Sequence, residues 1–243
     1  MALRDKFNIY EIEIWYIPTS MIQEPKYQAM SIVFLGNFNP KIFQPAWFVS
    51  ENLIKEEEQD KIDNGNLIII DSDLLQFRLP DWLLLRVVKN RFQISVTNEA
   101  FYEEGRDLVY GTFKILKHTP ISKMGINLEM HFQMESEEKW HALGDFYAPK
   151  KPWEKILKKP GLSSLIIEEQ RPDKYKGFIR VKIEPTMQIV KKNGVLIDIN
   201  DHFETSNPET NIGCAEIIEI FEKSWEKSLK RSKDIIYNIL RKI

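Results

Sequence analysis

The feature that most constrains the fold is a pattern that occurs twice without gaps, over 87–98 and again over 190–201. In both segments a Lys-Asn turn precedes a run in which apolar and polar residues alternate. A period of two is typical of a β-strand with one buried face. The segments end at Asn98 and Asp201, and both residue types cap helices. The chain is therefore predicted to contain two copies of one folding unit.

A shorter repeated motif supports the same interpretation. Leu-Gly-Asn-Phe at 35–38 and Leu-Gly-Asp-Phe at 143–146 are each followed within a few residues by Pro-Lys. We interpret both as one structural corner, in which a flexible glycine and a polar turn residue precede an aromatic plug. The boundary between the units is placed after Ser122. The predicted repeats are therefore 1–122 and 123–243, together forming one compact pseudo-symmetric body.

The first repeat shows a strand-rich pattern. A short helix is expected from Asn39, with Pro40 at its first position and Pro45 as its end. Residues 56–65 are interpreted as a charged connector, and a long helix is expected after Asn98. Strands are expected at 9–17, 29–35, 67–71, 74–79, 82–88 and 92–97.

The second repeat follows the same order. Strands are expected at 126–134, 165–169, 178–183 and 195–199, a short helix at 153–157, and a helix from Ala215 to Ile243 with an apolar stripe. The unit is thus a strand, a short helix, three or four antiparallel strands and a long helix. This order predicts an α+β fold with the long helices on one face of the sheet.

Composition narrows the class of protein. A hydrophobic fraction of 43% supports a large core, and the formal charge of −2 argues against a globally basic nucleic-acid binder. A single cysteine excludes an internal disulfide and suits a reducing compartment. The first residues lack the pattern of a signal peptide, and no apolar run is long enough to cross a bilayer. We expect a soluble cytoplasmic protein without a membrane partner.

The sharpest binding candidate is the basic segment 150–159. Its lysines surround a tryptophan, an arrangement that can track phosphates while the indole stacks on a base. The alternative is a short amphipathic helix with Trp153, Ile156 and Leu157 in the core and the lysines in solvent. The candidate binding residues are Lys150, Lys151, Trp153, Lys155, Lys158 and Lys159.

Candidates for catalysis are weaker. Asp201, His202 and Glu204 are close enough in sequence to supply an acid/base pair or metal ligands, although Asp201 is also explained as a residue at the end of a strand. Cys214 begins the last helix without a recognisable nucleophile signature, so packing explains it better. The histidines show no metal-ligand spacing, and no nucleotide-binding or nucleophile-elbow motif occurs.

These observations rank three functions. A non-enzymatic binding or adaptor protein comes first, acting through a protein partner or as a homodimer that covers exposed sheet edges. Nucleic-acid binding through Lys150–Lys159 is second. Hydrolysis around Asp201, His202 and Glu204, acid/base or metal-assisted, is third. No cofactor and no metal are expected.

Overall fold

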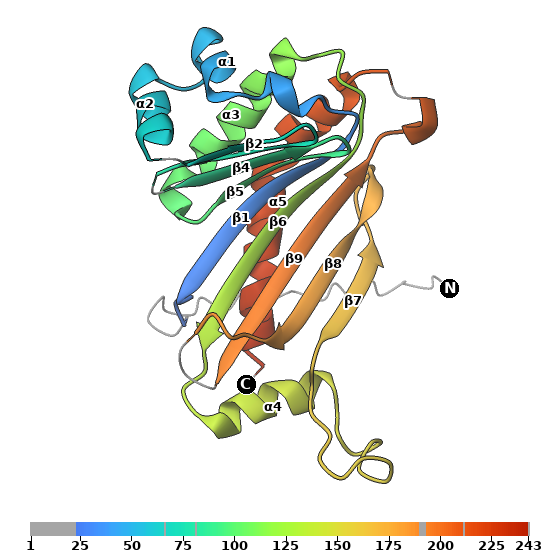
Figure 1. The fold of residues 1–243 in the computed structure, drawn as a ribbon. Coiled ribbons are helices and arrows are strands. Elements are labelled where there is room, and N and C mark those ends of the chain that lie inside the picture. Colours follow the sequence, from blue (N-terminus) through green and yellow to red (C-terminus); the bar gives the residue numbers. More distant parts are fainter. Residues whose placement is uncertain (1–22, 66, 81, 190–192, 211, 243) are drawn as a thin grey trace, which may run out of the picture.

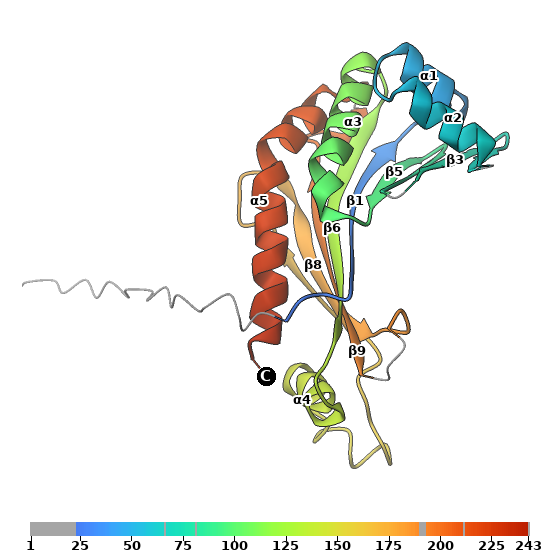
Figure 2. The same ribbon diagram turned by 90° about the vertical axis from the view of Figure 1, so that its left-hand side faces the viewer.

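A single antiparallel sheet organises the molecule. The computed structural model describes residues 23–65, 67–80, 82–189, 193–210 and 212–242. Within these ranges nine strands follow the order β2-β3-β4-β5-β1-β6-β9-β8-β7. Helices α3 and α5 lie side by side on one face, and the elements of the described ranges leave the opposite face open (Figures 1 and 2). The α+β class is confirmed, and both halves of the chain contribute to the same sheet.

The strands and helices have the following bounds. The strands are β1 (Tyr27–Gly36), β2 (Ile68–Ile70), β3 (Leu74–Leu79), β4 (Leu83–Val88), β5 (Arg91–Val96), β6 (Ile121–Gln133), β7 (Leu165–Gln170), β8 (Lys176–Pro185) and β9 (Gly194–Glu204). The α-helices are α1 (Pro45–Ser50), α2 (Glu56–Asn64), α3 (Tyr102–Ile115), α4 (Glu137–Tyr147) and α5 (Ala215–Leu240).

The two halves join at the centre of the sheet, where β1 pairs with β6 in an antiparallel register that places Ser31 opposite Asn127. In the first half the chain leaves β1, reaches the edge at β2 and returns through β3, β4 and β5 to pair with β1. In the second half it leaves β6, reaches the other edge at β7 and returns through β8 and β9 to pair with β6. Residues distant in sequence therefore meet on the central strands.

The core lies between the sheet and the two long helices. Because side chains alternate along a strand, one set of positions points at the helices and the other at the open face. Phe34 on β1 and Phe92 on β5 both contact Phe113 on α3, with ring centroids 5.0 and 4.9 Å apart. Full burial of one such side chain stabilises the fold by roughly 1.5–3 kcal/mol. The apolar alternation seen in the sequence thus predicts the helix-covered face.

Helix α5 is held by its apolar stripe and by a polar contact with α3. The stripe includes the buried residues Phe221, Trp225 and Ile236. The indole of Trp225 donates a hydrogen bond of 2.8 Å to Glu103 on α3. Neither α5 nor any other helix in the described part of the chain is long and apolar enough to cross a membrane.

Two local predictions in the first half need correction. Residues 56–64 form helix α2 and not a connector. Acidic residues fill the helix's first turn, where they favour its positive end, and Ile62 is buried. Pro45 does stop the preceding short 3₁₀ turn, Pro40–Ile42, but it also occupies the first turn of α1, where its missing N–H costs nothing.

The two Leu-Gly motifs do not form the same local structure. Residues 35–38 leave the end of β1, whereas residues 143–146 lie inside α4. Glycine is required at position 36 because the backbone of Pro120 lies close to it: a Cβ there would be 2.1 Å from the carbonyl oxygen of Pro120. A Cβ on Gly144 would meet only a side-chain atom of Leu162 at 3.6 Å. The two glycines therefore serve different structural needs.

The second half also departs from expectation. Residues 153–156 form turns and Leu157 belongs to no regular element, so the short helix predicted at 153–157 does not form. Strand β9 continues through Glu204, so Asp201 lies inside a strand and caps no helix. The predicted strand at 9–17 falls outside the described residues.

Candidate functional site

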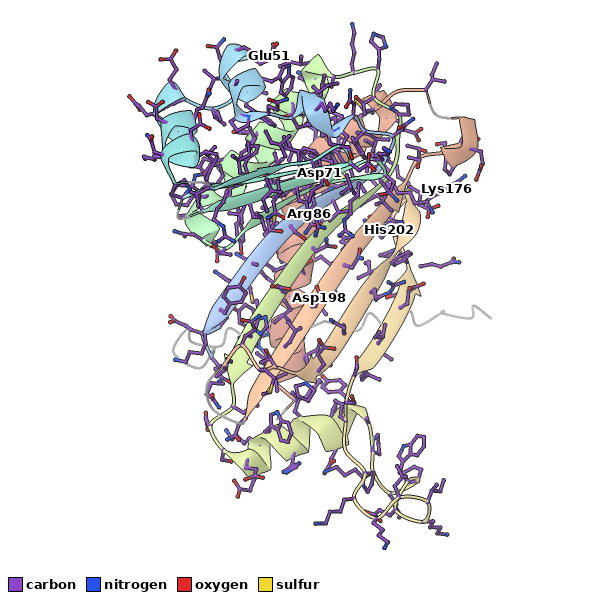
Figure 3. All side chains as sticks on the ribbon, in the orientation of Figure 1. Glu51, Asp71, Arg86, Lys176, Asp198 and His202 are labelled. Carbon is purple, nitrogen blue, oxygen red and sulfur yellow. The ribbon has the colours of Figure 1, made fainter. Side chains whose placement is uncertain are left out.

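The open face of the sheet carries a polar cleft with a volume of about 800 Å³. Its lining side chains come from both halves of the chain, from β3, β4 and β5 and from β1, β6 and β9. The sheet curves around this face on the side away from α5 (Figure 2). Figure 3 marks Asp198 in the middle of the open face. We call this hollow the open-face cleft.

The floor of the cleft is a row of amide and hydroxyl side chains. Ser95, Ser31, Asn127 and Asn200 lie directly opposite one another on the neighbouring strands β5, β1, β6 and β9. The Asn127 side-chain amide donates to the Ser31 hydroxyl at 3.0 Å, which fixes its orientation. Within the described part of the chain, Oδ1 of Asn127 and Oδ1 of Asn200 are buried and accept no hydrogen bond.

Gly125 leaves a notch beside these two oxygens. A Cβ built on Gly125 would lie 3.2 Å from Asn127 Oδ1 and 3.5 Å from Asn200 Oδ1. The amide nitrogen of Asn127 lies 3.6 Å from the same point. A side chain at position 125 would therefore meet the amide groups of both asparagines, and glycine keeps the space beside them open.

A pair of carboxylates forms the next row of the cleft. Glu129 on β6 lies opposite Asp198 on β9, and Ala29 on β1 lies opposite Glu129. The pKa of Asp198 is raised, because burial and the charge of Glu129 together outweigh the opposing charge of Lys182. Lys182 itself pairs with Glu184 at 3.0 Å. The charge of Asp198 is thus only partly compensated by the protein.

The rim of the cleft is aromatic on two sides. Trp82 stacks on Phe101 with ring centroids 5.4 Å apart, and Tyr27 packs edge-on against His131 at 5.1 Å. Burial and then the charge of Glu129 raise the pKa of Tyr27, whereas Arg78 lowers it. The cleft therefore combines aromatic walls, neutral acceptors and acidic groups, with Arg78 the basic residue among its lining side chains.

The cluster of Asp201, His202 and Glu204 does not converge. Because neighbouring residues on a strand point to opposite faces, Asp201 faces α5 while His202 and Glu204 face the open side. His202 stacks on Phe178 at 4.4 Å, and its Nε2 lies 3.3 Å from Glu204. Burial lowers the pKa of His202, although Glu204 opposes that shift. The three side chains therefore do not form one site.

The basic segment lies far from the cleft, between α4 and β7 at the lower end of the view (Figure 1). Lys150 pairs with Asp145 at 2.9 Å, and Trp153 is 53% exposed. Ile156 and Leu157 are exposed as well, so the alternative of a helix with these residues in the core is wrong. Lys151, Lys155, Lys158 and Lys159 are exposed around them.

Cys214 and His131 have packing roles. The Cys214 thiol is buried and donates to the carbonyl oxygen of Phe113 at 3.3 Å, and burial raises its pKa to about 11. Such a thiol holds its proton and is a poor nucleophile at neutral pH. His131 is buried and contacts the Thr186 hydroxyl at 2.7 Å. Neither residue lines the open-face cleft.

Sequence reasoning missed every residue of the cleft floor. Polar residues at alternate strand positions were interpreted as the solvent face, which is their usual role. The one available signal was that four carboxamide or carboxylate side chains lie on or next to the strands predicted at 126–134 and 195–199, namely Asn127, Glu129, Asp198 and Asn200. Across the described residues, no group of three His, Cys, Asp or Glu side chains is placed to hold a metal ion. No protein-family model matches the chain, and no curated protein resembles it significantly.

Proposed function

We propose that this is a non-enzymatic binding protein whose ligand lies in the open-face cleft. The observation that carries the proposal is the pair of buried amide oxygens, on Asn127 and Asn200, that no protein group satisfies in the described residues. A buried acceptor without a donor costs about 1–3 kcal/mol. Two such acceptors, side by side in a cleft, are what a ligand that donates hydrogen bonds would satisfy.

The shape and chemistry of the cleft support the same function. Small-molecule sites are typically hollows of about 300–1,000 Å³ with a few polar groups at defined positions. Here the polar groups sit on the central strands of the sheet, whose backbone hydrogen bonds fix their positions. Small side chains at Ala29, Ser31 and Ser95 leave the space above them free.

Native mass spectrometry of the purified protein tests this proposal. A bound small molecule should be retained by the natural chain and by Asn207→Leu, which changes an exposed loop amide. It should be lost from Asn200→Leu, which removes one of the orphaned oxygens. If no small molecule co-purifies and a broad metabolite collection shifts the melting temperature of Asn200→Leu as much as that of the natural chain, the cleft is not the ligand site.

A second surface supports the proposal of a protein partner. Strand β7 is an edge strand whose Ile166 and Ile167 are exposed, Ile167 by 57%. Further exposed apolar residues are Phe146 on α4 and Trp153, Ile156 and Leu157 in the segment between α4 and β7. We name these six residues the α4–β7 surface. An edge strand presents unpaired backbone groups that another strand can join. A second copy of this chain, pairing β7 with β7 about a twofold axis, would cover the edge and its isoleucines.

Light scattering over a range of concentrations tests the homodimer. Ile167→Lys should yield a monomer, whereas Ile212→Lys, at an exposed apolar residue away from β7, should leave the dimer intact. A natural chain that stays monomeric at every concentration contradicts this proposal.

The alternative is nucleic-acid binding through Lys150–Lys159, the segment that contributes Trp153, Ile156 and Leu157 to this surface. In that case the monomer binds single- or double-stranded DNA or RNA at low salt. Replacing Lys150, Lys151, Lys158 and Lys159 with Ala then weakens binding and reduces its salt dependence.

We further propose that the two halves are copies of one unit, as the ungapped match between 87–98 and 190–201 predicts. Among the described residues, the first strand of each half lies at the centre of the sheet and pairs with the last strand of that half. The acidic side chains and the two asparagines of the cleft come from β6 and β9, whereas β1 supplies Ser31 and β5 supplies Gln93 and Ser95. In this proposal the second copy has acquired the polar groups that recognise a ligand.

A further inference from the structure

We infer that the basic segment, residues 150–159, binds the surface of an anionic lipid bilayer. Trp153, Ile156 and Leu157 enter the boundary between headgroups and acyl chains, while the lysines contact the negatively charged headgroups. This inference goes beyond the proposed function, because it depends neither on the open-face cleft nor on the pairing of β7 with a second copy.

The segment exposes apolar side chains that no described part of the protein covers. Residues 151–159 are all exposed, among them Trp153 by 53%, Ile156 by 73% and Leu157 by 50%. The segment projects beyond α4, away from the sheet and the long helices (Figures 1 and 2). Apolar side chains exposed together in this way mark contacts with another protein or with a membrane. A partner outside the chain is therefore needed to bury these three residues.

The charge of the segment identifies the partner as anionic. Residues 150–159 contain five lysines and one glutamate, whereas the whole chain carries a formal charge of −2. Lys150 pairs with Asp145 at 2.9 Å, and the other four lysines form no ion pair in the described part of the chain. Clusters of about four to eight basic residues beside a membrane attract anionic lipids, and each residue adds to the affinity.

The two aliphatic residues favour a bilayer over a nucleic acid. Nucleic acids are bound mainly through basic groups and stacked aromatic rings, which accounts for the lysines and for Trp153 but not for Ile156 and Leu157. A bilayer surface accommodates all three kinds of side chain, because tryptophan collects at the headgroup level and aliphatic residues enter the acyl boundary. Such contact needs no segment that spans the bilayer, so the lack of a long apolar run in the sequence does not oppose it.

Flotation of the full chain with lipid vesicles tests the inference. One set of vesicles contains phosphatidylcholine alone, and the other contains phosphatidylcholine mixed with phosphatidylserine. The chain should float with the mixed vesicles and not with the neutral ones, and the bound fraction should fall as the salt concentration rises. No flotation with the mixed vesicles at low salt, or equal flotation with both sets, would overturn the inference.

A first double variant tests the apolar insertion. Ile156→Ser with Leu157→Ser keeps every lysine and should weaken binding to the mixed vesicles at least tenfold, because it removes the apolar area that the bilayer buries. Ile212→Ser is the matched control, at an apolar residue that is 88% exposed elsewhere, and should bind like the natural chain. Circular dichroism melts confirm that both variants fold. Undiminished binding by the folded double variant contradicts the inference.

A second double variant tests the charge. Lys158→Ala with Lys159→Ala should also weaken binding to the mixed vesicles at least tenfold. Lys223→Ala with Lys227→Ala removes two exposed lysines from α5 and should leave binding unchanged. Equal losses in the two lysine variants would show that the segment is not the contact, and would overturn the inference.

A nucleic acid is the competing partner of the same lysines, and its binding has a different signature. Binding of DNA or RNA at low salt that is lost from Lys158→Ala with Lys159→Ala, but kept by Ile156→Ser with Leu157→Ser, assigns the segment to nucleic acid if the natural chain does not float with the mixed vesicles. That result would overturn the inference and support the alternative given under the proposed function.

Discussion

The hydroxyl of Ser228 on α5 donates a hydrogen bond of 2.7 Å to the carboxylate of Asp201 on β9, and both side chains are buried. Arg171 donates to the same carboxylate, and its guanidinium lies over the ring of Phe203 at 3.6 Å. Arg231 on α5 completes the cluster, 3.5 Å from Asp201. Asp201 therefore links the sheet to the long helix α5, on the face opposite the open-face cleft.

Asp201→Asn is expected to lower the free energy of unfolding by about 3–5 kcal/mol, because it removes the fully buried carboxylate that pairs with the buried guanidinium of Arg171, which then keeps only its pair with Asp173. Urea unfolding measures the change. Glu168→Gln removes an exposed carboxylate from its pair with Arg180 and should cost about 0–1 kcal/mol. A loss below about 1 kcal/mol for Asp201→Asn would show that Asp173 alone compensates Arg171.

Acid should weaken the same cluster through Asp173. Burial raises the pKa of Asp173, but hydrogen bonds and charge from Arg171, the Tyr175 N–H and Arg231 outweigh it and lower the pKa to about 2. A carboxyl whose pKa is lower in the folded state adds stability above its ordinary value of 3.8, and this stability is lost as the pH falls toward 2. Between pH 5 and pH 2 the free energy of unfolding should therefore fall more steeply for the natural chain than for Asp173→Asn. Equal slopes of the free energy of unfolding against pH for the two proteins would contradict this role.

Asn200→Leu should raise the free energy of unfolding by up to about 1 kcal/mol, because it replaces an unsatisfied buried acceptor with an apolar group of similar size. Residues that serve binding commonly reduce stability in this way. Asn127→Leu should raise the free energy of unfolding by less, since this variant also loses the hydrogen bond to Ser31. Thermal and urea unfolding of the ligand-free protein measure both. A clear loss of stability in Asn200→Leu would assign that amide a structural role.

Gly177→Ala should destabilise the protein, whereas Gly161→Ala should not. Gly177 has a φ of 131°, and a Cβ there would lie 2.1 Å from the carbonyl oxygen of His202. Backbone strain of this kind costs on the order of 1–3 kcal/mol before the clash is counted. A Cβ on Gly161 would meet nothing within 4 Å, so its substitution should stay within about 0.5 kcal/mol of the natural chain. Equal melting temperatures for the two variants would contradict this expectation.

Local patterns predicted much of the fold. The strand at Leu74–Leu79 has the predicted bounds, and the turn at Lys89–Asn90 separates β4 from β5 as expected. The amphipathic stripe of α5 correctly indicated its start at Ala215 and its buried face, although the helix ends at Leu240 and not at Ile243. These features depend on neighbours within a few residues, so periodicity and turn chemistry reveal them.

Elements whose state depends on distant packing were misassigned. Helix α2 has a strongly charged sequence and is anchored through Ile62, which sequence alone does not mark as buried. The Leu-Gly dipeptide at 143–144 does not specify a turn by itself. It lies inside α4 because the residues on both sides of it form a helix. The same limit applies to Asp201, whose face of the sheet is decided by the register of β9 against β6 and β8.

By itself, the sequence determined the class of fold and the alternation that separates the helix-covered face from the open face, because both follow from short-range periodicity. Only the tertiary structure decided that Asn127 and Asn200, on strands far apart along the chain, lie side by side above Gly125. Strand pairing and the curvature of the sheet turn an ordinary polar face into a cleft. Both are properties of the whole assembled sheet.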